Sequence, residues 1–344
     1  MTNREYYLLT LNFEPFADGR AKYAASSKAT EDIRTILKEN FTIKEKILTR
    51  RFRNKLIGPI EFIIKFFCIC ITIPKGGIVF IQYPMVNIIA FVKVLRLLKR
   101  YRTIAIIHDL QSYRYENQHH KREQELKIIN TFDFVIVHSD KMKSILQNDG
   151  IVTQMIVLQA FDYILPQDMS IQRKTDTVVF AGVLHKSVFL QKMNKITENT
   201  LSYNLYGILH DEIKLASFMN YKGLFPPNNV SIIEGEWGLL WDGDSIEDCE
   251  GQFGRYLEMI APHKFSLYLA SGLKVIVWEK SAMSPIVKNR NLGIIVKNLY
   301  EVSQKISALS EKEKNDMDNN VQIIKNEIRT GHFFMSSMKK INFQ

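Results

Sequence analysis

A lysine at the start of a predicted helix is the residue whose position points most directly to chemistry. Pro262 suits the first turn of a helix, and Gly272 suits its end. Lys264 would lie in that first turn, where free N–H groups and the helix dipole attract phosphate and disfavour a cation. The pattern therefore predicts a phosphate-binding site at Lys264. The alternative is an exposed lysine that binds nothing.

An acidic segment upstream of this helix is a second candidate. Asp242-Gly243-Asp244 resembles a pair of carboxylates that could hold Mn²⁺ or Mg²⁺ on a diphosphate. Three further acidic residues follow by position 250. The alternative is a solvated acidic loop beside a binding cleft. The three cysteines are too few for a disulfide framework, and their spacing does not suit a zinc site.

The elements that would position these residues alternate along the chain. Residues 1–165 predict strands at 6–11, 41–48, 78–82, 103–107, 134–137 and 155–158, with helices near 22–39, 57–71, 86–100, 116–130 and 141–148. Strands that alternate with helices form parallel sheets covered on both faces. The first half is therefore expected to be one Rossmann-like α/β domain.

The same alternation restarts after a polar stretch, 166–176, which we interpret as a linker. The second half predicts strands at 177–181, 201–206, 230–233, 238–241 and 275–278, with helices at 211–219, 254–270, 285–289 and 301–329. We expect two Rossmann-like domains that face each other across a cleft, at 1–165 and 177–325, and a C-terminal helix or tail at 326–344. Ligands of such sheets bind beyond the carboxyl ends of the strands. The glycine patterns of dinucleotide-binding and P-loop enzymes are absent from the sequence.

Composition and charge limit the class of protein. The 344 residues are 46% hydrophobic and 24% charged, as in folded globular proteins. Residues 1–165 hold 25 Lys and Arg against 16 Asp and Glu, whereas the rest hold 21 against 20. Basic stretches at 44–55 and 93–102 could meet an anionic acceptor or membrane surface, and no recognised motif supports nucleic-acid binding. Because the most apolar run, 62–73, is too short to span a bilayer and no secretory signal opens the chain, we expect a cytoplasmic protein, at most peripheral to the inner face of the cell membrane.

The chain resembles a bacterial family of GT-B glycosyltransferases. The run PHKFSLYLASGLKVIVW (262–278), preceded by GLLWDG (238–243), is similar to the C-terminal signature of that family. The segment IHDLQSYR (107–114) and the strand at 132–139 resemble its first half, so that the similarity extends from about residue 24 to 301. The family includes glucosyltransferases that extend N-acetylglucosamine on serine-rich adhesins and β-1,6-galactofuranosyltransferases of surface polysaccharides. The resemblance implies a GT-B fold and a UDP-sugar donor bound mainly by the second domain.

The resemblance also assigns the donor site residue by residue. It implies that the donor is bound by Gly182, Lys186, Tyr206, Gly207, Asp242, Pro262, His263 and Lys264. Lys274 replaces the proline of the family's GLPVIVW, a departure that we expect to affect only a loop. The glycine-containing N-terminal loop of the family is matched only loosely, at residues 16–20. Metal-holding transferases with a DxD motif have one continuous α/β domain, whereas this chain predicts two, so we expect no metal site and no cofactor besides the donor.

An inverting transfer needs a group in the first domain that takes the proton of the acceptor hydroxyl. Asp109 and His108 end a central strand and are expected to face the cleft, and Asp109 is the first candidate for this base. Asp18, in the first loop after a strand, is its rival. The structural alternative for Asp109 is a cap on the following helix.

These observations predict a metal-independent hexosyltransferase. It would move glucose, galactose or galactofuranose from a UDP-sugar to a glycan, glycoprotein or lipid-linked acceptor in surface polysaccharide or adhesin glycosylation. The alternative is a non-catalytic nucleotide-sugar-binding subunit of another glycosyltransferase. The sequence does not decide between a monomer and a homo-oligomer, or which sugar is transferred.

Overall fold

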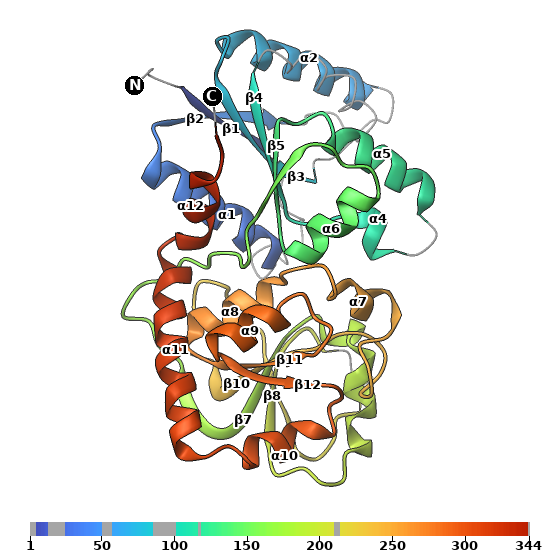
Figure 1. Cartoon of the computed structure of the whole chain (residues 1–344), viewed down its shortest axis with the longest axis vertical. Helices are drawn as coiled ribbons and strands as arrows, with labels where there is room; N and C mark the ends of the chain where they lie inside the picture. Colours follow the sequence, from blue (N-terminus) through green and yellow to red (C-terminus); the bar gives the residue numbers. More distant parts are fainter. Residues whose placement is uncertain are drawn as a thin grey trace.

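The chain folds into two α/β domains joined end to end (Figure 1). The computed structural model describes residues 5–12, 25–49, 57–84, 101–115, 118–209 and 214–342. Each domain is built on one six-stranded sheet. The two Rossmann-like domains expected from the alternation of strands and helices are therefore confirmed.

The first sheet is entirely parallel and has the order β2-β1-β3-β4-β5-β6. Its strands are β1 (Tyr6–Asn12), β2 (Ile43–Thr49), β3 (Ile78–Tyr83), β4 (Arg102–Ile107), β5 (Phe134–Val137) and β6 (Gln154–Val157). Nearly every residue of the central strands β3, β4 and β5 is buried, as expected for a parallel sheet covered on both faces. This burial explains why their sequences are continuous apolar runs.

The second sheet is also parallel and has the order β12-β11-β10-β7-β8-β9. Its strands are β7 (Gln172–Gly182), β8 (Ser202–Gly207), β9 (Met219–Gly223), β10 (Glu234–Leu240), β11 (Lys274–Trp278) and β12 (Gly293–Val296). The chain moves outward from β7 in one direction and from β10 in the other. The neighbouring strands β7 and β10 therefore mark the point where the winding of the sheet reverses.

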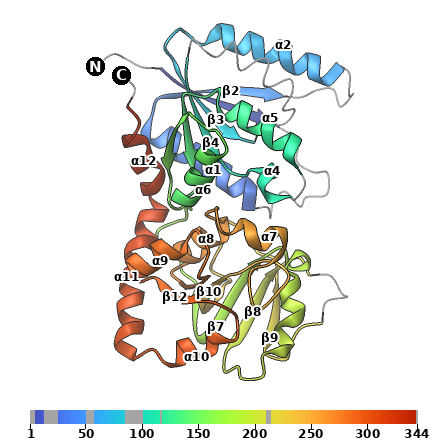
Figure 2. The same ribbon diagram turned by 45° about the vertical axis from the view of Figure 1, so that its right-hand side comes forward.

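Helices cover both sheets. Those of the first domain are α1 (Ala25–Asn40), α2 (Ile57–Thr72), α4 (Gln111–Arg114), α5 (His119–Ile129) and α6 (Asp140–Asn148). Those of the second are η3 (Leu184–Lys186), η4 (Val188–Lys195), α7 (Gly251–Tyr256), α8 (His263–Ser271), α9 (Ser284–Arg290), α10 (Glu301–Ser307) and α11 (Glu311–Arg329), and α12 (His332–Lys339) follows. Helices α7 and α8 lie at the end of the second domain that faces the first (Figures 1 and 2).

The chain crosses between the domains twice, and the two crossings are bonded to each other. After α11 the chain returns to the first domain, where α12 packs beside α1 (Figure 1). The buried Arg329 donates hydrogen bonds to the carbonyl oxygens of Pro166, Gln167 and Met169 on the first crossing. The carboxylate of Asp162, on the same crossing, accepts hydrogen bonds from the two backbone N–H groups at 333 and 334. These bonds hold the two crossings side by side.

Several predicted elements have different boundaries in the structure. The helix expected over 254–270 is two helices, α7 and α8, because Pro262 adopts an extended conformation and precedes α8 as its N-cap. The helix expected over 301–329 breaks between α10 and α11, where Ser310 and Glu313 form a capping box. The first crossing is shorter than the predicted linker, since β7 begins at Gln172 and pairs there with β10.

Two further predictions in the second domain are wrong. The strand expected at 230–233 is a turn that leads into β10. Met219, predicted to end a helix, instead begins the edge strand β9 beside β8. The sequence MNYKG of this strand is polar, because most residues of this edge strand are exposed and need not be apolar. A pattern of apolar runs therefore does not predict it. The predicted helix at 86–100 lies wholly outside the described residues.

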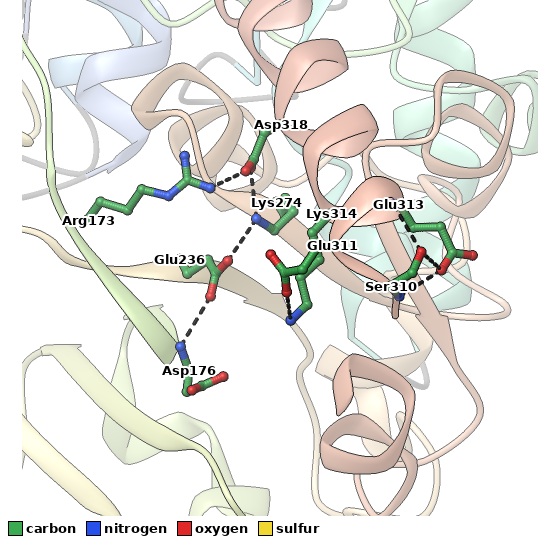
Figure 3. Close-up of polar contacts among 9 residues, drawn as sticks. All are labelled: Arg173, Asp176, Glu236, Lys274, Ser310, Glu311, Glu313, Lys314 and Asp318. Atoms are coloured by element: carbon green, nitrogen blue, oxygen red, sulfur yellow. Dashed lines mark hydrogen bonds and ion pairs between the residues drawn. The ribbon is translucent and has the colours of Figure 1, made fainter. Parts of the chain in front are cut away.

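Lys274 lies inside the second domain, so the prediction that it affects only a loop is wrong. It is the first residue of β11, and its side chain is 0% exposed. Its ammonium group is 2.9 Å from the Glu236 carboxylate and 2.8 Å from that of Asp318 on α11, and Asp318 also pairs with Arg173 (Figure 3). Where the resembling family has proline, this chain has a buried cation that joins α11 to the sheet.

Candidate active site

The reversal of winding between β7 and β10 lies beside several of the predicted donor residues. Gly182 ends β7 and Lys186 ends the short helix after it, while Asp242 follows β10. In open parallel sheets, the space beyond this reversal is where ligands bind. Lys264, in the first turn of α8, reaches the same place from the side.

Lys264 contacts both strands that form this point. Its Nζ donates a hydrogen bond of 2.6 Å to the Trp241 carbonyl, lies 3.4 Å from the Asp242 carboxylate and lies 4.8 Å from the centre of the Phe180 ring. The side chain is only 13% exposed, so the alternative of an exposed lysine is wrong. The carboxylate of Asp242 and the carbonyl of Trp241 offset the charge that the helix dipole disfavours.

Gly207, at the end of β8, has a steric role. Gly182 and Gly207 are paired at the ends of β7 and β8, and Gly207 has φ +147°. A Cβ on Gly207 would lie 1.8 Å from the Gly182 carbonyl oxygen. Glycine is therefore required at position 207 if β7 and β8 are to end side by side.

Tyr206 does not present its side chain to this space. Its ring is buried, and its hydroxyl donates to the Ile232 carbonyl (3.2 Å) and accepts from the Glu234 N–H (2.9 Å). Its phenol therefore packs inside the second domain, and only its backbone lies near the strand end.

Lys186 lies 5.8 Å from the ring of Phe253, which is on α7.

His263 turns toward the first domain rather than toward the strand ends. It follows Pro262 at the start of α8, and its ring stacks on Phe161 with the ring centres 4.6 Å apart. Burial lowers the pKa of His263 to about 3. The ring is therefore neutral at physiological pH.

On the side of the first domain, Asp109 takes part in a contact between the domains. Its Oδ1 accepts a hydrogen bond of 2.8 Å from the hydroxyl of Tyr256 on α7, and its Oδ2 pairs with Arg114 at 2.9 Å. The Asp109 side chain is partly exposed, and each carboxylate oxygen has a second lone pair. Each oxygen can therefore still accept a hydrogen bond from a ligand.

His108 is held in one orientation. Gln82 donates its amide N–H to the Thr30 carbonyl at 3.0 Å, which turns its Oε1 toward His108. The His108 Nε2 lies 2.7 Å from that oxygen and must therefore carry the hydrogen. Burial lowers the pKa of His108 well below its ordinary value.

Asp18, the rival to Asp109, lies outside the described residues, as does the whole loop at 16–20.

Two residues that the sequence analysis did not select complete the arrangement. His138 follows β5 just as His108 follows β4; its Nε2 donates to the Ile107 carbonyl (2.9 Å), and its Nδ1 accepts from the Ala261 N–H of the second domain (3.2 Å). Burial lowers the pKa of His138 to about 4. Phe161, after β6, contacts the rings of His108, His138 and His263. The strand-end rule that selected His108 could have found His138, but no sequence signal marks Phe161.

Side-chain hydrogen bonds join the domains in this region. Besides the bonds of Tyr256 and His138, the hydroxyl of Ser139 donates to the Met259 carbonyl at 2.7 Å. These bonds join the ends of β4 and β5 to α7 and to the segment between α7 and α8.

A cavity of about 450 Å³ lies at another part of the domain junction, between α1 and residues 164, 227 and 228. None of the predicted site residues lines it. Lys28 and Asp32 form a buried ion pair in its wall, and Lys28 also donates to the Ile164 carbonyl at 2.6 Å. Burial raises the pKa of Asp32 to about 6.

Asp242 faces a lysine rather than other carboxylates. Across the described ranges, no three His, Cys, Asp or Glu side chains come together in a way that could hold a metal ion. Within those same ranges, no helix has the length and apolar character needed to cross a bilayer.

The chain is similar to known glycosyltransferases over its whole length. Residues 6–160 match the family described as glucosyltransferase 3-like, N-terminal domain, and residues 178–341 match the C-terminal domain of the same family. The β-1,6-galactofuranosyltransferase WbbI of Escherichia coli K12 is 26% identical over 345 residues, which cover 98% of each chain. Glucosyltransferase 3 of Streptococcus gordonii is 24% identical over 271 residues, or 76% of this chain and 78% of that protein.

A solved structure shows the same fold. Anabaena HepE, determined in complex with UDP and glucose, aligns with a TM-score of 0.58 at 12% sequence identity and covers 98% of this chain and 99% of its own. The predicted GT-B fold, with two Rossmann-like domains, is thereby confirmed.

Proposed function

The chain belongs to the glucosyltransferase 3-like family of glycosyltransferases, and from this we infer that it transfers a hexose from a UDP-sugar to a glycan, glycoprotein or lipid-linked acceptor. The relatives' names support glucose or galactofuranose as the sugar. The complex of HepE with UDP and glucose supports a UDP-linked donor.

The donor diphosphate is proposed to bind at Lys264. The observation that carries this assignment is the convergence of the first turn of α8, the ends of β7 and β10, and a lysine whose charge the helix dipole disfavours. In the structure Asp242 offsets that charge. When the donor binds, its phosphates would take over that role, and the lysine would stabilise the departing UDP.

The transfer is proposed to need no metal ion. The pairing of Asp242 with Lys264 supports this, because a lysine beside the carboxylate supplies the positive charge that Mn²⁺ would otherwise bring. Asp109 is proposed to take the proton of the acceptor hydroxyl, since its carboxylate is partly exposed at the domain junction.

A transfer assay tests these proposals. Purified protein, a panel of UDP-sugars and a lipid-linked or glycan acceptor should give product in the presence of EDTA. Slow hydrolysis of one UDP-sugar without acceptor would separate an enzyme from a subunit that only binds nucleotide sugar. Loss of turnover with EDTA and its return with Mn²⁺ would contradict the metal-independent mechanism and make Asp242 and Asp244 ligands.

We further propose that the enzyme works at the inner face of the cell membrane, with its first domain toward the lipid. The excess of positive charge in residues 1–165 supports this proposal, because anionic headgroups attract basic surfaces. The basic residues 50–55 of the predicted stretch lie outside the described residues.

A further inference from the structure

Helix α2 exposes a stripe of large apolar side chains. Ile60, Ile64, Phe67 and Ile71 are 60%, 58%, 49% and 62% exposed. Their spacing of four, three and four residues places them on one face of the helix. We call these four residues the α2 stripe.

The opposite face of α2 already packs into the core of the first domain. Phe62, Phe66 and Cys70 are buried there. The two charged residues of α2, Glu61 and Lys65, pair with each other at 2.6 Å. A helix on the surface of a soluble domain normally has a polar outer face, so the α2 stripe requires an explanation other than the stability of the domain.

The position of α2 suits contact with a flat surface. In both views the helix lies along the end of the first domain that is farthest from the second domain (Figures 1 and 2). The second domain, which provides the proposed donor site, is at the opposite end of the molecule. A surface that meets the α2 stripe would therefore leave the donor site free.

Positive charge flanks the stripe in the sequence. Arg50, Arg51, Arg53 and Lys55 come directly before α2, and the exposed Lys75 follows it. An apolar stripe bordered by cations is the pattern of helices that lie in the plane of an anionic bilayer. A second copy of this chain would carry the same excess of positive charge in residues 1–165, so that the two first domains would repel each other.

We propose that α2 docks on a lipid bilayer with anionic headgroups, with the α2 stripe inserted at the boundary between headgroups and acyl chains. The inference deepens the membrane contact proposed above and rests on it, and it is independent of the transfer chemistry. The basic residues bring the first domain to the surface, and the stripe supplies the apolar contact that holds it there.

Vesicle binding of matched variants tests the proposal. The stripe variant combines Ile60→Gln, Ile64→Gln and Ile71→Gln. The control combines Val152→Gln and Ile323→Gln, whose side chains are 88% and 59% exposed elsewhere. Partition onto vesicles of phosphatidylcholine with phosphatidylglycerol should fall by about tenfold or more in the stripe variant and stay at the wild-type value in the control. Affinity for UDP should be equal in all three proteins, which shows that each is folded.

A label on α2 gives a second readout. Cys68 is exposed, whereas Cys70 and Cys249 are buried, so that a polarity-sensitive dye can be attached to Cys68 of the wild-type chain. Its emission should shift to shorter wavelength on mixed vesicles, and less in high salt. The single Ile64→Gln variant should show a smaller shift, and it serves if the triple variant does not fold.

The outcomes separate this inference from the proposals on which it rests. Wild-type partition by the folded stripe variant would overturn docking through α2. A second result would also overturn it: a wild type that is a dimer and binds no vesicles, and a stripe variant that is a monomer. The α2 stripe would then be covered by a second copy of the chain. Failure of the wild type to bind any vesicle would refute the membrane contact itself, whereas failure to transfer sugar to a soluble acceptor would refute only the enzymatic proposal.

Discussion

At the scale of single residues, the site consists of charged groups that already have partners. Lys264 pairs with Asp242, and Asp109 pairs with Arg114 and accepts from Tyr256. The position of Lys264 at a helix start and those of Asp242 and Asp109 after strands were readable from the sequence. Their partners were not, since Tyr256 and Asp109 are 147 residues apart and meet only across the two domains.

Lys264→Met should weaken UDP binding by about ten- to a hundredfold, because a charge-assisted hydrogen bond to phosphate contributes roughly 1.5–3 kcal/mol. Calorimetric titration with UDP measures the change. The lost bond to the Trp241 carbonyl should also cost about 1 kcal/mol of unfolding free energy. Lys280→Met, which removes a half-exposed lysine of the same domain, is the control and should bind UDP as the wild type does. Unchanged affinity in folded Lys264→Met would exclude this lysine from the donor site.

Asp109→Asn should lower kcat by about 10²–10⁴-fold and leave UDP affinity unchanged, because the amide keeps the hydrogen bond from Tyr256 but cannot accept a proton. Tyr256→Phe is the comparison, since it removes the contact between the domains and keeps the carboxylate. Steady-state kinetics of both variants decide between two roles. Wild-type kcat in Asp109→Asn, together with a loss of kcat in Tyr256→Phe, would mean that Asp109 acts through the contact between the domains and is not the base.

At the scale of elements, apolar runs revealed the buried strands but not the edges of the second sheet. β11 is wholly buried, and an apolar run predicted it. β9 has the sequence MNYKG and was missed. Lys274 is the sharpest case, because a cation at the first position of a strand is expected to be exposed. Instead, two carboxylates bind its ammonium group (Figure 3), and the ring of Trp237 lies 4.9 Å from it.

Lys274→Met should destabilise the protein by roughly 2–4 kcal/mol, because it leaves the carboxylates of Glu236 and Asp318 largely buried without their shared cation. Urea unfolding measures the effect. The matched control is Lys314→Met, which removes the surface ion pair between Lys314 and Glu311 on α11, the helix that also carries Asp318. It should change stability by about 0.5 kcal/mol or less. Equal stability of the two variants would show that the buried network contributes nothing.

At the scale of the whole molecule, the sequence predicted two domains and a cleft but not how the domains touch. Which residues of one domain bond to the other depends on the final placement of two sheets, and no local pattern records that placement. His138, whose ring receives the Ala261 N–H from the second domain, is the clearest residue of this kind.

The stability contributed by His138 should fall as the pH drops from about 6.5 toward 4. Its folded pKa is lowered to about 4, whereas the unfolded chain takes up the proton near 6.5. In this window the unfolded state therefore binds more protons, and protonation of the folded state would break the bond from Ala261. The wild type should lose roughly 3 kcal/mol relative to His138→Gln between these limits. Thermal unfolding of both proteins across this pH range gives the difference in their stability. Asp32, whose raised pKa makes its own contribution change in the opposite direction, is present in both proteins, so its effect cancels in this difference. A constant difference would contradict the assignment.

The two crossings between the domains have a mechanical consequence. Arg329 fixes them to each other near the second domain, and Asp162 fixes them near the first. A single connecting segment would let the two domains rotate freely relative to each other. Two chain segments bonded to each other at both ends resist torsion. The domains can therefore separate only by a hinge motion about one axis. The donor and acceptor sides would therefore return to the same alignment at each closure.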